Sequence, residues 1–295
     1  ISYNPWDEST RWVDHHTGMS EMIEAITADG VVLDTEGKSS PERQAAADKV
    51  RPGVIMYSEG MAVPKDMEGI VSGRVHNALY YPPLLNLNKF IRPDFAIFRV
   101  AELYLEPIRR EYALSMFNGY GTEVNQFRPG HPNWVEEDYR FWGRTLRVLR
   151  ENSGVFTQKQ FLPLLATQRD SMYVNEWPGT NKTVFTLFSL QPAGYRGPLF
   201  ETPQQSAHHV VDLWNHTEIK PLEKNGRWQI PVDLESFAQK WLGTNNEGAV
   251  GAIAIFSELL QVERKGDVLS FSASRGQTIR IWSGHPAYDH SPKEY

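Results

Sequence analysis

The sequence contains no cysteine, which excludes disulfide bonds, thiolate metal ligands and cysteine nucleophiles together. It also lacks any apolar run close to the roughly 20 residues that a membrane-spanning helix requires, so we expect no membrane partner. An excess of basic residues is missing too. Because 36 acidic residues outnumber 30 basic ones, for a formal charge of -6, we expect no nucleic-acid partner.

Aromatic residues, in contrast, are plentiful: the chain has 9 Trp, 12 Tyr and 14 Phe. Their flat apolar faces can stack on sugar rings, although any single aromatic residue can equally fill a core. The chain opens at Ile1 with neither an initiator methionine nor a signal peptide, which favours a start within a domain. We expect a periplasmic or extracellular location if the complete protein carries a signal peptide.

Residues 1–158 alternate short apolar runs with segments of helical period, which is typical of α/β proteins. Because the strands are fewer than the eight of a closed barrel, we predict the carboxyl-terminal part of a (β/α)8 TIM-type barrel. An amino-terminal segment or a second chain would then complete it. The predicted strands are 30–33, 53–57, 95–98 and 113–117, and the predicted helices are 20–27, 41–48 and 135–152.

Residues 159–295 change to a period of two, with turn-forming residues between the runs. This pattern predicts a separate all-β domain, an antiparallel β-sandwich. The predicted strands are 172–175, 183–189, 208–213, 228–232, 251–256, 268–273 and 278–282.

Acidic residues stand at the ends of two predicted strands, Asp34 after the first and Glu59 after the second. Since parallel strands bring their carboxyl ends to one rim, these two carboxyl groups are expected to lie together. Hydrolysis of a glycosidic bond by the usual route requires such a pair. For either acid alone, a helix cap or a loop salt bridge is the alternative.

Other side chains near the same strand ends are candidates for binding sugar hydroxyls or covering an apolar sugar face. Glu36 is also a rival catalytic acid, and a nearby Arg99 would favour the ionised form of the nucleophile. The predicted substrate-binding residues are Trp6, Asp7, Glu36, Arg99, Asn118 and Tyr120.

The adjacent pairs His15–His16 and His208–His209 lack the spacing of helix-borne zinc ligands. We therefore predict no metal site, and we expect no cofactor. Ser58-Glu59-Gly60 also lacks the G-x-S-x-G arrangement of a serine hydrolase.

The run Asp29-Gly-Val-Val-Leu-Asp34, a following strand that ends at Glu59 and a carboxyl-terminal all-β region together resemble one enzyme class. That class is the retaining glycoside hydrolases of the α-amylase and α-galactosidase-like superfamilies. The resemblance implies a glycosidase of polysaccharide degradation, with Asp34 as nucleophile and Glu59 as general acid/base. One alternative is a non-catalytic carbohydrate-binding or scaffold protein with a barrel remnant. Another is a metal-dependent hydrolase.

Overall fold

A computed structural model describes residues 2–3, 15–34, 37–59, 67–75, 84–102, 109–125, 135–237, 248–257, 261–272, 280–281 and 293–294. The chain divides into two compact units. The first comprises residues 1–104 and 120–128, and the second comprises residues 105–119 and 129–295. This division differs from the predicted boundary at residue 158, because the helices between residues 109 and 156 group with the later strands.

The first unit contains a six-stranded sheet in which every pairing is parallel and the strands follow their order in the sequence. Among the described residues, helices of this unit lie in three of the five connections between neighbouring strands, and parallel pairing requires such connections to be long crossovers. The strands are β1 (Ser2–Tyr3), β2 (Gly30–Leu33), β3 (Ile55–Ser58), β4 (Ser72–Val75), β5 (Ala96–Glu102) and β6 (Gly121–Asn125), and the helices are α1 (His15–Ile26), α2 (Pro41–Val50) and α3 (Asn88–Ile91).

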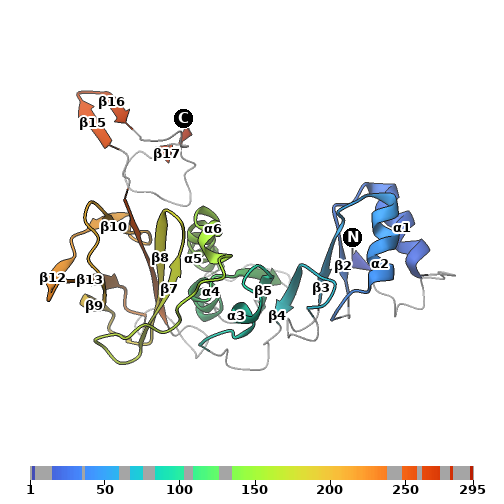
Figure 1. Cartoon of the computed structure of the whole chain (residues 1–295), viewed down its shortest axis with the longest axis horizontal. Coiled ribbons are helices and arrows are strands. Elements are labelled where there is room, and N and C mark those ends of the chain that lie inside the picture. The colour runs from blue at the N-terminus through green and yellow to red at the C-terminus, as the bar shows by residue number, and fades with distance from the viewer. Residues whose placement is uncertain are drawn as a thin grey trace. The chain divides into compact units, whose positions relative to one another are not determined.

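Helix α2 begins where the sequence predicts it, because its first turn is capped. The Ser40 hydroxyl accepts a hydrogen bond from the Arg43 amide at 3.1 Å, and Pro41 occupies a first-turn position where its missing N–H costs nothing. Helices α1 and α2 lie side by side (Figure 1), and the Ser20 hydroxyl of α1 donates to the carbonyl of Ala46 at 3.1 Å. The β2–α2–β3 unit is therefore built as predicted.

The two faces of the parallel sheet have different surroundings. Alternate residues such as Val31, Leu33 and Met56 are almost fully buried and form one core with residues of α1 and α2. Their neighbours Val32 and Tyr57 are only half-buried, because successive side chains of a strand point to opposite faces. The sheet thus has one face packed on helices and another that carries polar side chains.

In its described residues, the second unit has three helices, two larger antiparallel sheets and two small strand pairs. The helices are α4 (Arg109–Phe117), α5 (Val135–Glu151) and α6 (Ser153–Phe156). The five-stranded sheet has the order β11 (Thr217–Ile219), β10 (His209–Asp212), β14 (Ala249–Phe256), β8 (Lys182–Ser189) and β7 (Met172–Pro178). The three-stranded sheet has the order β12 (Leu222–Lys224), β13 (Arg227–Leu234) and β9 (Tyr195–Pro203).

These two antiparallel sheets share one hydrophobic core, to which β8 contributes Phe185, β9 contributes Phe200 and β13 contributes Ile230. Helix α4 packs on β8, α6 packs on β7 and β8, and α5 packs on α4 and α6 (Figure 1). The change from parallel to antiparallel pairing follows the change of period in the sequence. Strand β9 was not predicted, since Gly197 and Pro198 interrupt its apolar pattern.

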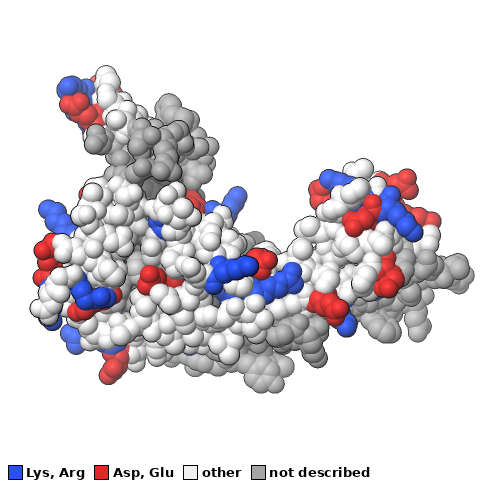
Figure 2. Space-filling view, in the orientation of Figure 1, with Lys and Arg blue, Asp and Glu red and all other residues white. Residues whose placement is uncertain are grey.

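The remaining strands form two short antiparallel pairs, β15 (Gln261–Lys265) with β16 (Val268–Ser272) and β17 (Arg280–Ile281) with β18 (Lys293–Glu294). The β15–β16 hairpin carries charged side chains of both signs (Figure 2), and Lys265 pairs with Glu263 at 3.1 Å. Among the described residues, no helix has the length and apolarity to cross a bilayer.

One predicted strand, 113–117, is wrong: these residues form the last part of α4. A short apolar run cannot be told from a buried helix by its period alone. Ala113, Leu114 and Met116 are strong helix formers, and every residue from 112 to 117 is buried. Burial on all sides therefore produced the continuous apolar run that was interpreted as a strand.

Candidate active site

Asp34 and Glu59 directly follow a register pair of neighbouring parallel strands. Leu33 of β2 pairs with Ser58 of β3, and the Glu59 amide donates to the Leu33 carbonyl at 3.2 Å. Neighbouring strands of a sheet lie about 4.8 Å apart. The structure therefore brings the two predicted acids to adjacent strand ends in the same register.

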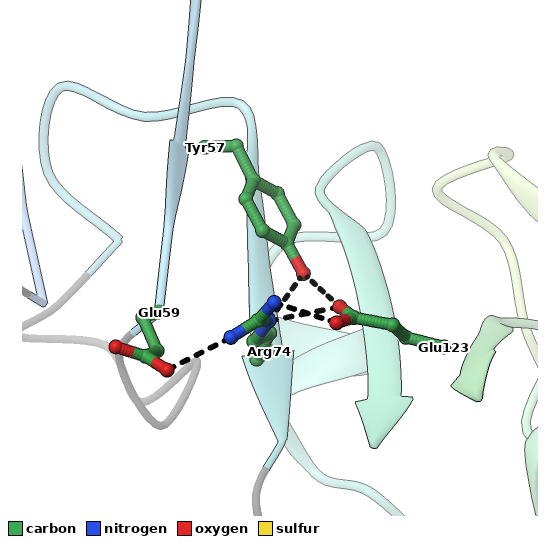
Figure 3. A network of polar contacts seen from close by, with 4 residues as sticks. All are labelled: Tyr57, Glu59, Arg74 and Glu123. Atoms are coloured by element: carbon green, nitrogen blue, oxygen red, sulfur yellow. Dashed lines mark hydrogen bonds and ion pairs between the residues drawn. The ribbon is translucent and has the colours of Figure 1, made fainter. Parts of the chain in front are cut away.

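A guanidinium group lies between Glu59 and another carboxylate, Glu123 of β6 (Figure 3). Arg74 of β4 donates through Nη1 to Oε1 of Glu59 at 2.8 Å. It also forms a two-point contact with Glu123, through Nε to Oε2 at 2.8 Å and through Nη2 to Oε1 at 2.5 Å. The Arg74 side chain is 19% exposed and both carboxylates are 26% exposed, so the group is largely but not fully removed from water.

Tyr57 of β3 completes this network. Its hydroxyl donates to Oε2 of Glu123 at 2.7 Å and accepts from Nε of Arg74 at 3.1 Å. Burial and then the neighbouring Glu123 carboxylate raise the pKa of Tyr57 well above its ordinary value, so the phenol stays protonated. Burial alone would lower the pKa of Arg74, but its bonds to Glu123 and Tyr57 raise it overall, which keeps the guanidinium charged.

Strand alternation explains why these side chains meet. Tyr57 lies on β3 and Glu59 follows two residues later, directly after the strand, and Arg74 is in register one step beyond the Ser58–Gly73 pair. They therefore point to the same face of the sheet, opposite to the helix-packed core. Tyr57 also packs edge-on against Phe98 of β5, with ring centroids 6.0 Å apart. Strand β5 lies between β4 and β6, so the Arg74 side chain crosses it to reach Glu123.

Two of the predicted substrate-binding residues, Arg99 and Tyr120, lie on the helix-packed side of the sheet. Arg99 shares the face of buried Ile97, is 1% exposed and is hydrogen-bonded to Tyr120. Burial lowers the pKa of Arg99 although Tyr120 opposes that effect, and burial raises the pKa of Tyr120. A cation that does bond a predicted catalytic acid is Arg74, which pairs with Glu59, whereas the Arg99 side chain lies on the other side of the sheet.

Asn118 follows helix α4, and not a strand as the sequence predicted. Its amide and its side-chain Nδ2 both bond the Leu114 carbonyl, at 3.0 and 2.9 Å, which caps the helix end. Asn118 therefore does not stand at a strand end. The other predicted substrate-binding residues, Trp6, Asp7 and Glu36, lie outside the described residues.

Sequence reasoning missed Arg74, Glu123 and Tyr57 as site residues. The strands β4 (Ser-Gly-Arg-Val) and β6 (Gly-Thr-Glu-Val-Asn) are short, polar and glycine-containing, so they give little strand signal. The sequence offered one signal for these strands. In each of them a single charged residue stands next to a valine, at the spacing of a βα repeat. Within the described part of the chain, no cluster of three or more His, Cys, Asp or Glu is arranged to hold a metal ion.

No protein-family model matches the sequence, and no curated protein matches it. Solved structures do match. An Anoxybacillus α-amylase is similar with a TM-score of 0.53 and 10% identity, over 81% of this chain and 63% of that enzyme. An α-amylase from Geobacillus thermoleovorans, complexed with acarbose, is similar with a TM-score of 0.54 and 10% identity, over 81% and 62%.

A debranching enzyme from Nostoc punctiforme is similar with a TM-score of 0.53 and 11% identity, over 80% of this chain and 61% of that enzyme. The predicted resemblance to α-amylase-type glycoside hydrolases is therefore confirmed at the level of the fold. This chain spans a little under two-thirds of the length of these three enzymes.

Proposed function

We propose that the chain is the larger part of a retaining glycoside hydrolase, with Asp34 as the nucleophile and Glu59 as the general acid/base. The observation that carries this proposal is the register of the two acids at adjacent strand ends. A strand spacing of about 4.8 Å is compatible with the roughly 5 Å between carboxyl groups in retaining enzymes. The α-amylase-type fold supports it, because active sites of (β/α) barrels lie at the carboxyl ends of the strands.

The reaction would proceed in two displacements. Asp34 attacks the anomeric carbon while Glu59 protonates the leaving glycosidic oxygen, which gives a covalent glycosyl–enzyme and a free alcohol. Glu59, now ionised, then removes a proton from water, and the resulting hydroxide displaces Asp34. Glu59 thereby regains its proton and the cycle closes.

We also propose that the parallel sheet belongs to a (β/α)8 barrel and that the two antiparallel sheets form a β-sandwich. A further segment of the polypeptide, or a second chain, would supply the strands needed beside the six that the structure describes. The coverage of the similar enzymes, at 61 to 63% of their length, favours this addition. Assays therefore require the complete polypeptide.

The substrate class proposed is a carbohydrate with an O-glycosidic bond. Aryl α- and β-glycosides form the first screen, and maltose-type oligosaccharides form the second, since the similar Geobacillus enzyme is complexed with acarbose. On the best substrate, we expect Asp34→Ala and Glu59→Gln each to lower kcat by about 1,000-fold or more.

Matched controls exist in the same unit of the fold. Asp29→Asn changes an exposed acid at the opposite end of β2, where it pairs with Arg51, and Glu68→Gln changes an exposed acid that pairs with Lys38 at 3.5 Å. Both controls should keep full activity. Azide should restore turnover of an activated aryl glycoside in both Glu59→Ala and Asp34→Ala, but with different products. Glu59→Ala should give a glycosyl azide of retained configuration, because azide attacks the glycosyl–enzyme, and Asp34→Ala should give one of inverted configuration, because azide attacks the substrate itself. Unchanged activity in both active-site variants would overturn the assignment.

A further inference from the structure

We propose that Arg74 and Glu123 form a fixed support for Glu59, in which Arg74 positions the Glu59 carboxyl group and Glu123 is the permanent counter-ion of Arg74. This inference rests on the proposed role of Glu59. It concerns how one side chain keeps its place through a change of its own charge.

The contacts to Arg74 are unequal. Glu123 receives two bonds, from Nε and Nη2, whereas Glu59 receives one, from Nη1. Two-point contacts between arginine and carboxylate are stronger and more directional than single ones. Glu123 therefore determines where the guanidinium lies, and Tyr57 holds both partners through its bonds at 2.7 and 3.1 Å.

Charge balance leads to the same division of roles. One guanidinium faces two carboxylates here, so the group carries one excess negative charge when both acids are ionised. Protonation of Glu59 leaves Arg74 neutralised by Glu123, and ionisation of Glu59 adds a second partner. A general acid/base alternates between these two forms in each turnover. Because Glu123 stays ionised, Arg74 keeps its two bonds to Glu123 whether Glu59 is protonated or ionised.

The charged and titratable groups near Glu59 come from each neighbouring strand that the structure describes. Asp34 follows the adjacent strand in register, Arg74 lies on the other side, and Glu123 and Tyr57 lie beyond Arg74. Neutralising Glu123 would leave Glu59 as the main counter-charge of Arg74, and neutralising Arg74 would leave Glu59 among like charges. The two changes should therefore shift the titration of Glu59 in opposite directions, to lower pH without the Glu123 charge and to higher pH without the Arg74 charge.

The test is the pH dependence of kcat/KM in the complete polypeptide, with the best aryl glycoside as substrate. We expect Glu123→Gln to move the alkaline limb to lower pH by about one unit, and Arg74→Gln to move it to higher pH by about one unit. Arg74→Lys, which keeps the charge but not the fork, should leave the limb near its wild-type position and lower kcat about tenfold. Glu68→Gln should change neither quantity.

A second readout separates this inference from the proposed function. In protein labelled with ¹³C at glutamate carboxyl groups, the Glu59 resonance, assigned with Glu59→Gln, gives its titration directly. Opposite displacements of that titration in Glu123→Gln and Arg74→Gln support the network even if no glycoside is hydrolysed. Displacements in the same direction, or none in either folded variant, overturn it, whatever the activity.

Discussion

The Ser58 hydroxyl donates to the carbonyl of Gly37 at 2.7 Å, and Ser58 is fully buried. This bond ties the end of β3, one residue before Glu59, to the segment that follows Asp34. The two predicted catalytic acids are thus linked twice through their neighbours, by this bond and by the bond from the Glu59 amide to the Leu33 carbonyl. Their spacing depends on these contacts, because both acids stand where the regular strands end.

The first prediction follows from this link. Ser58→Ala should lower kcat about tenfold, because a small displacement of one acid relative to the other is costly to catalysis. It should also lower the free energy of unfolding by about 1–2 kcal/mol, because the Gly37 carbonyl loses its donor. Steady-state kinetics and urea unfolding measure the two effects.

Ser20→Ala is the matched control, since Ser20 donates to the Ala46 carbonyl between α1 and α2. We expect a similar loss of stability with unchanged kcat. Equal losses of activity in both variants would show that Ser58 acts through stability alone.

The second prediction concerns the alkaline limb of the pH profile. Because burial and Glu123 raise the pKa of Tyr57 well above its ordinary value, the phenol should not ionise within the working range. Tyr57→Phe should therefore leave the limb in place and lower kcat less than tenfold. Spectrophotometric titration should show the same tyrosinate transition near pH 10 in the variant and in the wild type, because Tyr57 does not contribute to it. A displaced limb would assign that ionisation to Tyr57.

The predictable part of the candidate site was the placement of Asp34 and Glu59 at adjacent strand ends. Val31, Val32 and Leu33 form an apolar run that ends at Asp34, and Gly53 to Tyr57 form another that ends near Glu59. Such runs mark buried parallel strands, and parallel strands leave no choice about which ends meet. Ser40 and Pro41 between the two runs predict the start of a helix, so the β2–α2–β3 unit could be predicted from the sequence.

The unpredictable part was what surrounds the pair. Arg74 and Glu123 lie on strands whose sequences are mostly polar, and they stabilise each other across β5, 49 residues apart in the chain. A contact between residues so far apart in the chain produces no local pattern in the sequence from which it could be predicted. The placement of Arg99 was unpredictable for a related reason: the sequence puts it near a strand end, whereas in the structure it lies within β5 and its side chain is buried.

The third prediction tests the second unit. The Thr186 hydroxyl donates to the Phe117 carbonyl at 2.7 Å and accepts from the indole N–H of Trp177 at 2.9 Å. Thr186→Val keeps the shape but removes both bonds, so the buried Trp177 donor loses its partner. We expect the free energy of unfolding to fall by about 2–3 kcal/mol in urea titrations.

Thr183→Val is the control for that change, because Thr183 lies on the same strand and is only half-buried. A β-branched valine suits a strand, so the control should change the stability by less than about 0.5 kcal/mol. Equal effects at the two positions would mean that the loss reflects strand propensity and not the bonds to Phe117 and Trp177.

The fourth prediction concerns Lys89, which is 4% exposed and donates through Nζ to the Pro93 carbonyl at 2.8 Å. Burial lowers its pKa from 10.5 to about 8, although the charge of Asp94 opposes this. Between pH 8 and 10.5 the unfolded chain therefore binds more protons at this site than the folded protein does. Burial of Lys89 lowers the free energy of unfolding by its full amount below pH 8, and this loss fades as the pH rises toward 10.5.

Lys89→Met should accordingly raise the free energy of unfolding at pH 7 by roughly 1–3 kcal/mol, and this gain should vanish by about pH 10.5. Urea unfolding of both proteins across that range measures the difference. Lys38→Met, at an exposed lysine paired with Glu68, should show almost no gain at any pH. A gain for Lys89→Met that stays constant with pH would mean that methionine packs better and that the charge of Lys89 is not the cause.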